Sequence, residues 1–206
     1  MATLSVPPII EYGMATYAVP GQSESGDRYL MRQRSNGVLI AVVDGLGHGD
    51  EAAAAAKLAI AVLQGSREES VIALTQKCHE KLRTSRGVVM SMASIDATQG
   101  LMTWIGVGNV QGLILRHGAI KGTPHEELLL RAGVVGAQLP PLQAAVLPVT
   151  HGDTLVFATD GIRSGFSADI SALEPPQKCA DRILATYCRQ NDDALVVVSR
   201  YREVRS

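Results

Sequence analysis

Short apolar runs separated by turn residues dominate the start of the chain and predict β-strands. The expected strands cover residues 9–19, 29–34 and 38–43. Asn36-Gly37, between the last two, is a strong signal for a hairpin. Two helices are expected next. The first covers residues 50–64, where alanine is frequent, and the second begins at Ser66, with Glu69 completing a capping box, and ends near Arg83.

The second half of the chain returns to the strand pattern. Strands at 88–95 and 101–107 pair around a turn at 97–100, and strands at 110–116 and 127–131 continue them as a meander. Residues 132–148, rich in Gly, Pro and Gln, predict a loop, which either faces a substrate or is a structural excursion. A strand at 154–159, a helix at 177–189 and a strand at 194–201 complete the α+β pattern, with sheets in the centre and helices outside.

Composition restricts the classes of function. The 206 residues are 46% hydrophobic, enough for one domain, 1–206, with a core of its own. A formal net charge of -1 gives no basic face for nucleic acid or a membrane surface, so neither partner is expected. Nothing in the sequence has the pattern of a coiled-coil seam, and a monomer is the expected state.

The cysteines and the N-terminus indicate a cytoplasmic protein. The chain has three cysteines, an odd number, and no two of them have CxxC spacing: Cys78, Cys179 and Cys188. This pattern predicts neither a disulfide framework nor a zinc site. Residues 1–19 lack the basic start of a signal peptide. The longest apolar stretch, residues 52–63, is about half a bilayer span and contains Lys57, so no transmembrane segment is expected.

Aspartates stand at the ends of apolar strands at four places in the sequence. They are Asp27, Asp44, Asp160 and the pair Asp192-Asp193. With Asn36-Gly37 as the turn of the hairpin, the two strands pair so that Tyr29 lies opposite Asp44, and Asp27 lies two residues beyond Tyr29. Both carboxylates then lie on one face of the sheet, with backbones offset by about 7 Å. A slip of one residue would move one of them to the opposite face.

Several carboxylates gathered without a basic partner repel one another, so either their pKa values rise or a cation neutralises them. Carboxylate, carbonyl and water ligands select hard ions such as magnesium or manganese rather than zinc. Gly45 and Gly161 each follow an aspartate and let the backbone approach an ion. One Asp-Gly step alone is more often a plain turn. Four acidic strand ends together favour a metal site.

Other polar residues have simpler interpretations. His48 is either a residue of the helix N-terminus or a catalytic group. Gly106-Val107-Gly108-Asn109 lacks the third glycine of a dinucleotide loop, and Asn109 is expected to hold a turn. Asp50 and Glu51 are expected to stabilise the first turn of their helix and not to bind an ion.

The acidic motifs, in this order, resemble the metal-dependent protein phosphatase (PPM) family in its SpoIIE-like branch. The resemblance extends from Ser25-Gly26-Asp27 and the motif at 44–49, through Gly106-Val107-Gly108-Asn109, to Thr159-Asp160-Gly161 and Asp192-Asp193. It implies a four-layer α/β/β/α sandwich of two antiparallel sheets flanked by helices. It also implies a protein serine/threonine phosphatase with two divalent cations, manganese or magnesium, that activate water for direct attack on phosphorus.

The resemblance also implies which residues form the site. Asp27, Asp44 and the Gly45 carbonyl would hold one cation. Asp44, Asp160 and Asp192 would hold the other, with Asp193 as the alternative to Asp192 because Leu195 stands where relatives usually have Thr. Asp44 and His48 are the expected catalytic residues, His48 as an acid for the leaving serine oxygen. Arg28-Tyr29-Leu30 departs from the family pattern, in which a second acid is common.

Within this branch, the short chain and the Gly106-Val107-Gly108-Asn109-Val110 motif resemble the feedback phosphatases of the stressosome. The implied substrates are phosphoserine and phosphothreonine on STAS-domain stressosome proteins, whose dephosphorylation resets a bacterial stress response. Two alternatives stay open. One is a phosphatase of a phosphorylated anti-sigma-factor antagonist, and the other is a pseudophosphatase that only binds a phosphoprotein, which has no need to keep repelling carboxylates together.

Overall fold

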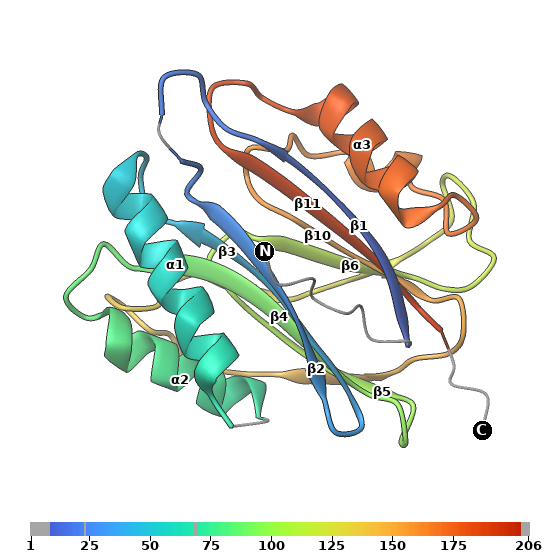
Figure 1. The fold of residues 1–206 in the computed structure, drawn as a ribbon. Coiled ribbons are helices and arrows are strands. Elements are labelled where there is room, and N and C mark those ends of the chain that lie inside the picture. Colours follow the sequence, from blue (N-terminus) through green and yellow to red (C-terminus); the bar gives the residue numbers. More distant parts are fainter. Residues whose placement is uncertain (1–8, 23, 68–69, 203–206) are drawn as a thin grey trace.

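The computed structural model describes residues 9–22, 24–67 and 70–202, which form four stacked layers (Figure 1). Helices α1 (Asp50–Gly65) and α2 (Val71–Leu82) cover one sheet, and α3 (Pro176–Tyr187) covers the other. A short 3-10 helix, η1 (Phe166–Asp169), precedes α3. The expected α+β sandwich with helices on both outer faces is confirmed.

Each sheet combines strands from both halves of the chain. The first has the order β1-β11-β10-β6-β7, and the second has the order β2-β3-β4-β5-β8 with β9 also on β5. Neighbouring strands are antiparallel except β5 and β8, which pair in parallel. The strands are β1 (Ile10–Tyr17), β2 (Asp27–Arg34), β3 (Gly37–Gly45), β4 (Val88–Asp96), β5 (Leu101–Val107), β6 (Gln111–Leu115), β7 (Glu126–Glu127), β8 (Leu130–Arg131), β9 (Ala145–Pro148), β10 (Thr154–Ala158) and β11 (Ala194–Tyr201).

Three apolar clusters hold the layers together. The middle cluster lies between the sheets and includes Ile40 and Phe157, both with no exposed surface. A second cluster joins α1 and α2 to the outer face of their sheet, and a third joins α3 to the other sheet. β3 contributes to the first two clusters, so residues 38–43 are all buried. Burial on both faces explains why this strand is a continuous apolar run.

The hairpin between β2 and β3 has a different register from the expected one. Asp27 pairs with Asp44 and Arg34 with Gly37, a shift of two residues that makes Ser35 and Asn36 the turn. Gly37 belongs to the strand because a Cβ there would stand 1.8 Å from the Ile95 carbonyl oxygen. A shift of two keeps both aspartates on one face, and it places them directly opposite each other.

The expected meander is wrong beyond β5. The chain turns at Gly108, where φ is +98°, and β6 joins the other sheet beside β10. The strand expected at 127–131 is two short strands, β7 and β8, one in each sheet. Within the expected loop 132–148, the last four residues form β9, and fully buried Val135 forms a bridge with Val88. These contacts favour the structural alternative for this loop.

The start of α2 also differs from the expectation. Its N-cap is Ser70, whose hydroxyl accepts a hydrogen bond from the Ala73 amide at 3.4 Å. Ser66 is instead the C-cap of α1, because that helix continues to Gly65. Glu69 of the expected capping box lies outside the described residues. In α1, Asp50 and Glu51 occupy the first turn, as expected.

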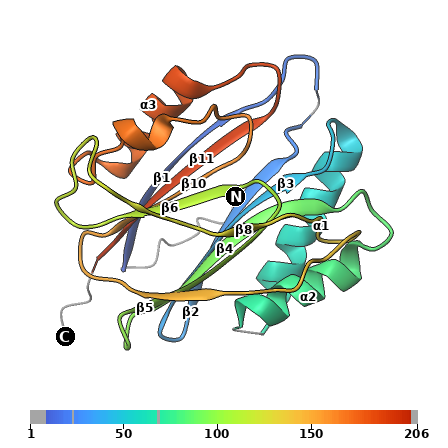
Figure 2. The ribbon, with the colours of Figure 1, turned by 180° about the vertical axis from the view of Figure 1, so that it is seen from behind.

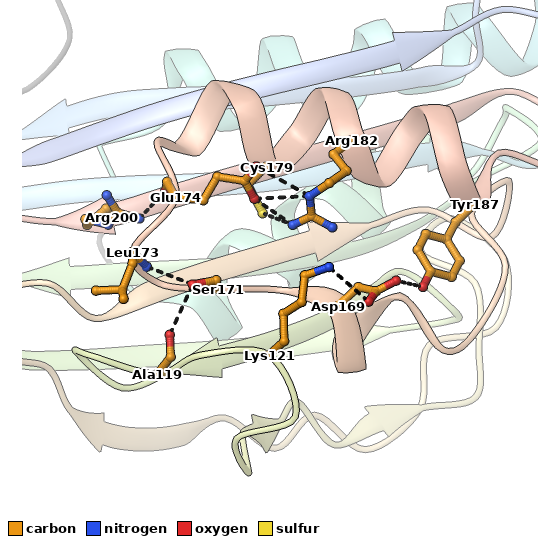
Figure 3. A network of polar contacts seen from close by, with 10 residues as sticks. All are labelled: Ala119, Lys121, Asp169, Ser171, Leu173, Glu174, Cys179, Arg182, Tyr187 and Arg200. Atoms are coloured by element: carbon orange, nitrogen blue, oxygen red, sulfur yellow. Dashed lines mark hydrogen bonds and ion pairs between the residues drawn. The ribbon is translucent and has the colours of Figure 1, made fainter.

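Polar contacts attach α3 to the segments beneath it (Figure 3). Arg182 forms an ion pair with Glu174 at 2.6 Å, and the backbone carbonyl of Glu174 accepts a hydrogen bond from Arg200 on β11. Asp169 of η1 contacts Lys121 and Tyr187. Together these bonds fix the chain between β10 and β11.

The cysteines and helices match two further expectations. Cys78, Cys179 and Cys188 are unpaired, the first two of them buried, so no disulfide framework exists. In the part of the chain that the structure describes, no helix has the length and apolar character needed to cross a membrane.

We expect Gly37→Ala to lower the free energy of unfolding by about 2 kcal/mol or more, because strands β3 and β4 must separate to admit the methyl group. Gly65→Ala is the matched control. A Cβ at Gly65 meets nothing within 4 Å, so this change leaves stability equal or raises it by up to about 1 kcal/mol through helix propensity. Urea unfolding of both variants measures the difference, and equal stabilities would contradict the observed register.

Candidate metal centre

Asp27 and Asp44 face each other where β2 begins and β3 ends. The Thr159 hydroxyl donates a hydrogen bond of 2.7 Å to Asp27 Oδ2, and itself accepts one of 2.8 Å from the Leu195 amide. Among the described residues, no hydrogen bond reaches the Asp44 carboxylate. Thr159 therefore fixes Asp27 and leaves Asp44 open toward the neighbouring pocket.

Burial makes this carboxylate pair reluctant to ionise in the absence of a cation. Burial raises the pKa of Asp27 to about 7. The Thr159 hydrogen bond opposes this shift, and the Asp193 and Asp160 charges add to it. Burial and the nearby Asp27 and Asp160 charges raise the pKa of Asp44 to about 9. A divalent cation would remove both the desolvation cost and the repulsion.

Asp160 reaches the same place from the end of β10. Its Oδ2 accepts a hydrogen bond of 2.8 Å from the Asn109 side-chain amide. Asn109 stands in the turn between β5 and β6, and Gln111 at the start of β6 pairs with Ala158 at the end of β10. The expectation that Asn109 holds a turn is therefore incomplete, because its side chain also orients an acidic residue of the site.

Asp192 and Asp193 have different surroundings. Asp193 is 7% exposed, and its carboxylate accepts hydrogen bonds from the Gly26 amide at 2.6 Å and the Val19 amide at 3.0 Å. Asp192 is exposed and lines the pocket. Burial, partly offset by a hydrogen bond from the Asp193 amide, raises the pKa of Asp192. The exposed carboxylate of Asp192 is therefore the better candidate for a cation ligand, whereas Asp193 holds the loop between β1 and β2.

A pocket of ≈ 530 Å³ brings the acidic residues together at one end of the sandwich. Asp44, Asp160 and Asp192 lie on its wall, and Asp27 lies behind Asp44. His48 is also on the wall and just precedes Gly49, the N-cap of α1, so both interpretations of this residue fit its position. The complete lining is Val19, Gln22, Asp44, Leu46, Gly47, His48, Val89, Asn109, Asp160, Asn191 and Asp192.

Gly45 brings α1 against this end of the sheet. A Cβ at Gly45 would stand 2.1 Å from the Ala52 carbonyl oxygen, so only glycine permits this approach of the first helical turn. The Gly45 amide donates a hydrogen bond of 3.2 Å to the Gly26 carbonyl, which continues the pairing of the hairpin beyond the two aspartates. The close packing fixes both Asp44 and the adjoining residues 46–49.

The donor set of the pocket fits a hard, hydrated cation. Its described wall carries three carboxylates and no Lys or Arg. Among the residues that the structure describes, no three His, Cys, Asp or Glu side chains converge tightly enough to enclose an ion by themselves. A site of this kind leaves places for water ligands, which magnesium commonly retains.

Sequence reasoning missed two supporting residues. Thr159 was noted only as part of the Thr159-Asp160-Gly161 motif, yet its hydroxyl connects Asp27 with β11. The position of Thr159, one residue before Asp160, was the sequence feature that could have indicated this role. For Asn109 the corresponding feature was its position just after a strand, at the end of the sheets where the aspartates lie.

Comparison with known families decides the affiliation. The family model for stage II sporulation protein E (SpoIIE) matches residues 34–202. The chain belongs to the SpoIIE family. The match includes Asp44, Asp160 and Asp192, and it covers most of the sandwich described above.

Individual relatives agree with this assignment. Phosphoserine phosphatase RsbX of Bacillus subtilis (strain 168) is 28% identical over 94 residues, which are 46% of this chain and 47% of RsbX. The matched region thus spans about half of this curated relative. A chain from a structural study of the bacterial stressosome, described as a modular system adapted to control secondary messenger signaling, is 31% identical. Its TM-score is 0.83, and the match covers 93% of this chain and 99% of that chain.

More distant structures share the fold. The crystal structure of RsbX in complex with magnesium is 19% identical with a TM-score of 0.80, covering 95% of this chain and 96% of that chain. The Mycobacterium tuberculosis serine/threonine phosphatase PstP/Ppp is 15% identical with a TM-score of 0.71, covering 94% and 99%. The sandwich of this SpoIIE-family chain is therefore that of the PPM phosphatases.

We expect the cation-free protein to lose stability as pH rises. The folded state keeps protons on Asp27 and Asp44 up to pH values of about 7 and about 9, whereas the unfolded chain releases them near 3.8. The folded state binds more protons in between, so the unfolding free energy falls across this window and is highest below it. Urea unfolding at several pH values in EDTA measures the slope.

The Asp44→Asn variant should have a smaller slope, and Asp96→Asn, at the turn between β4 and β5, should retain the wild-type one. Identical slopes in all three proteins would contradict the assignment of this pH dependence to the paired aspartates.

We expect Asn109→Ala to weaken binding of manganese or magnesium by about 10-fold to 100-fold, because Asp160 loses the bond that orients it. Isothermal titration calorimetry measures the affinity without relying on turnover. Asn36→Ala, in the β2–β3 turn at the other end of β3, is the matched control and should bind the cation as the wild type does.

Proposed function

We propose that this protein is a protein serine/threonine phosphatase that depends on two divalent cations, magnesium or manganese. The observation that carries the proposal is the convergence of Asp44, Asp160 and Asp192 on one pocket, with Asp27 paired to Asp44 and no Lys or Arg on the described wall. A binding module would gain nothing from the cost of keeping these carboxylates together. Membership of the SpoIIE family supports the same activity.

The side chains and one backbone carbonyl of the site would have the following roles. Asp27, Asp44 and the Gly45 carbonyl would hold one cation, and Asp44, Asp160 and Asp192 would hold the second. When bound, the cations would supply the Lewis acidity that activates water and offsets phosphoryl charge. Thr159 and Asn109 orient Asp27 and Asp160, so the ligands are arranged before substrate enters.

His48 is the group placed to serve the leaving oxygen. It lies on the wall of the pocket that holds Asp44 and Asp192, and its ring is the titratable donor there besides the acids. We propose that it donates a proton to the serine or threonine oxygen as that oxygen leaves phosphorus. The amide side chains of Gln22 and Asn191, on the same wall, would contact the phosphoryl group.

The proposed substrates are phosphoserine and phosphothreonine on STAS-domain proteins of a stressosome, of the RsbS and RsbR type. The 31% identity to a chain from a stressosome study and the similarity to RsbX support this choice. Removal of the phosphate would reset the stress response. The three unpaired cysteines suit a cytoplasmic enzyme.

The direct test is phosphate release from phosphorylated RsbS-like and RsbR-like proteins with magnesium or manganese. We expect Asp44→Asn to lower kcat/KM by about 1000-fold or more, which corresponds to a loss of about 4 kcal/mol of transition-state stabilisation. Asp96→Asn is the matched control, because that carboxylate only accepts bonds from the Thr98 and Gln99 amides in a distant turn.

The same assay separates the alternatives. Faster release from a phosphorylated anti-sigma-factor antagonist would replace the stressosome substrates but keep the phosphatase. Binding of phosphoprotein without turnover, in the presence of either cation, would indicate a pseudophosphatase. Near-wild-type turnover by Asp44→Asn would overturn the metal centre itself.

A further inference from the structure

A second pocket, of ≈ 200 Å³, is lined in part by residues that follow Asn109 and Asp160 of the candidate metal centre in the sequence. Three short segments line it, at residues 111–113, 127–130 and 164–167, with Leu129 the one residue of these ranges outside the lining. None of the residues of this pocket has a function in the metal centre described above. Its lining therefore needs a separate explanation.

The two pockets have no lining residue in common, but two stretches of chain run from one pocket to the other. Gln111, in the second pocket, is two residues after Asn109, in the first, which is about 7 Å of extended backbone. Ser164, in the second pocket, is four residues after Asp160, in the first. Because Gln111 pairs with Ala158, both stretches begin at the same end of neighbouring strands. Two short stretches of chain, both at this end of β6 and β10, thus connect the lining of the metal centre with that of the second pocket.

The lining has an apolar floor and a polar rim. Leu113, Leu128 and Phe166 are 3%, 7% and 2% exposed and supply the floor. The rim carries side chains that form hydrogen bonds, those of Gln111, Glu127, Ser164 and Ser167. A single apolar side chain on a polypeptide matches this arrangement, because the side chain meets the floor while the polar backbone stays at the rim.

Leu129 adds apolar surface on the same segment. It is 65% exposed, the highest value among the large apolar residues that the structure describes. It lies between Leu128 and Leu130, where the chain passes from β7 in one sheet to β8 in the other. Figure 2 shows β8 beside the strands of the second sheet. Both of these neighbours line the second pocket.

We propose that this second pocket is a docking subsite for an apolar side chain of the phosphoprotein substrate, two to five residues from the phosphorylated one, with Leu129 as an added contact. The inference rests on the proposed phosphatase function and explains how the phosphatase would select its substrate. Phosphate and cations are the same for every phosphoprotein, so discrimination must come from contacts outside the metal centre. A pocket connected to that centre by two short stretches of chain is placed to supply them.

The test uses phosphoserine peptides in which one leucine is moved from five residues before to five residues after the phosphoserine in an otherwise alanine- and serine-based sequence. One or two neighbouring positions should raise kcat/KM by about 10-fold over the leucine-free peptide. Ser164→Trp, an exposed position at the rim, should block the pocket and remove this preference. p-Nitrophenyl phosphate, which has no flanking residues, should be hydrolysed equally by both proteins.

Leu129→Ser provides a second variant and should reduce the preference several-fold. Its matched control is Leu173→Ser, since Leu173 is 63% exposed but lies on the segment leading into α3 (Figure 3). A flat peptide profile, or a preference unchanged in Ser164→Trp and Leu129→Ser, would overturn the subsite while p-nitrophenyl phosphate turnover keeps the phosphatase. Absence of all cation-dependent turnover by the wild type would instead overturn the proposed function.

Discussion

The strongest constraint on the structure is an unfavourable contact that the rest of the fold must offset. It is the pairing of the Asp27 and Asp44 carboxylates on adjacent strands. Like charges directly opposite each other destabilise a sheet, and burial adds to the cost. The surrounding structure offsets this cost through apolar packing on both faces of β3 and through α1 against Gly45. The fold thus supplies the stability that allows the site to hold groups which repel one another.

The carboxylates come from segments far apart in sequence, and neutral groups hold them in place. Thr159 binds Asp27, and Asn109 binds Asp160, each through a single hydrogen bond. Asp193 uses its own charge differently, by accepting amide hydrogen bonds from the N-terminal loop. Neutral partners leave the negative charge of these carboxylates available to a cation, whereas an arginine would neutralise it.

Much of the fold was predictable because apolar periodicity reports burial directly. β11 was predicted with both ends correct, and α1 within one residue. The β2–β3 register was wrong because Gly37 serves the close approach of Ile95 and not a turn, which only the neighbouring strand reveals. The crossing of β6 to the other sheet was missed because strand patterns do not say which sheet a strand joins. Asp27, Asp44 and Asp160 could be predicted as candidate ligands because they stand at or next to strand ends, whereas the role of Asn109 depends on a contact 51 residues away.

The position of β11 has a consequence for the synthesis of the protein. This strand lies between β1 and β10, so β1 has its sheet partner far along the chain, at residues 194–201. Until β11 leaves the ribosome, β1 has no strand beside it in its sheet, and Asp192 and Asp193, just before β11, are not yet available to the pocket. The acidic pocket therefore forms only after β11 has joined β1 to β10, through contacts between residues far apart in sequence, and a chain without β11 carries an unpaired strand that is prone to aggregation.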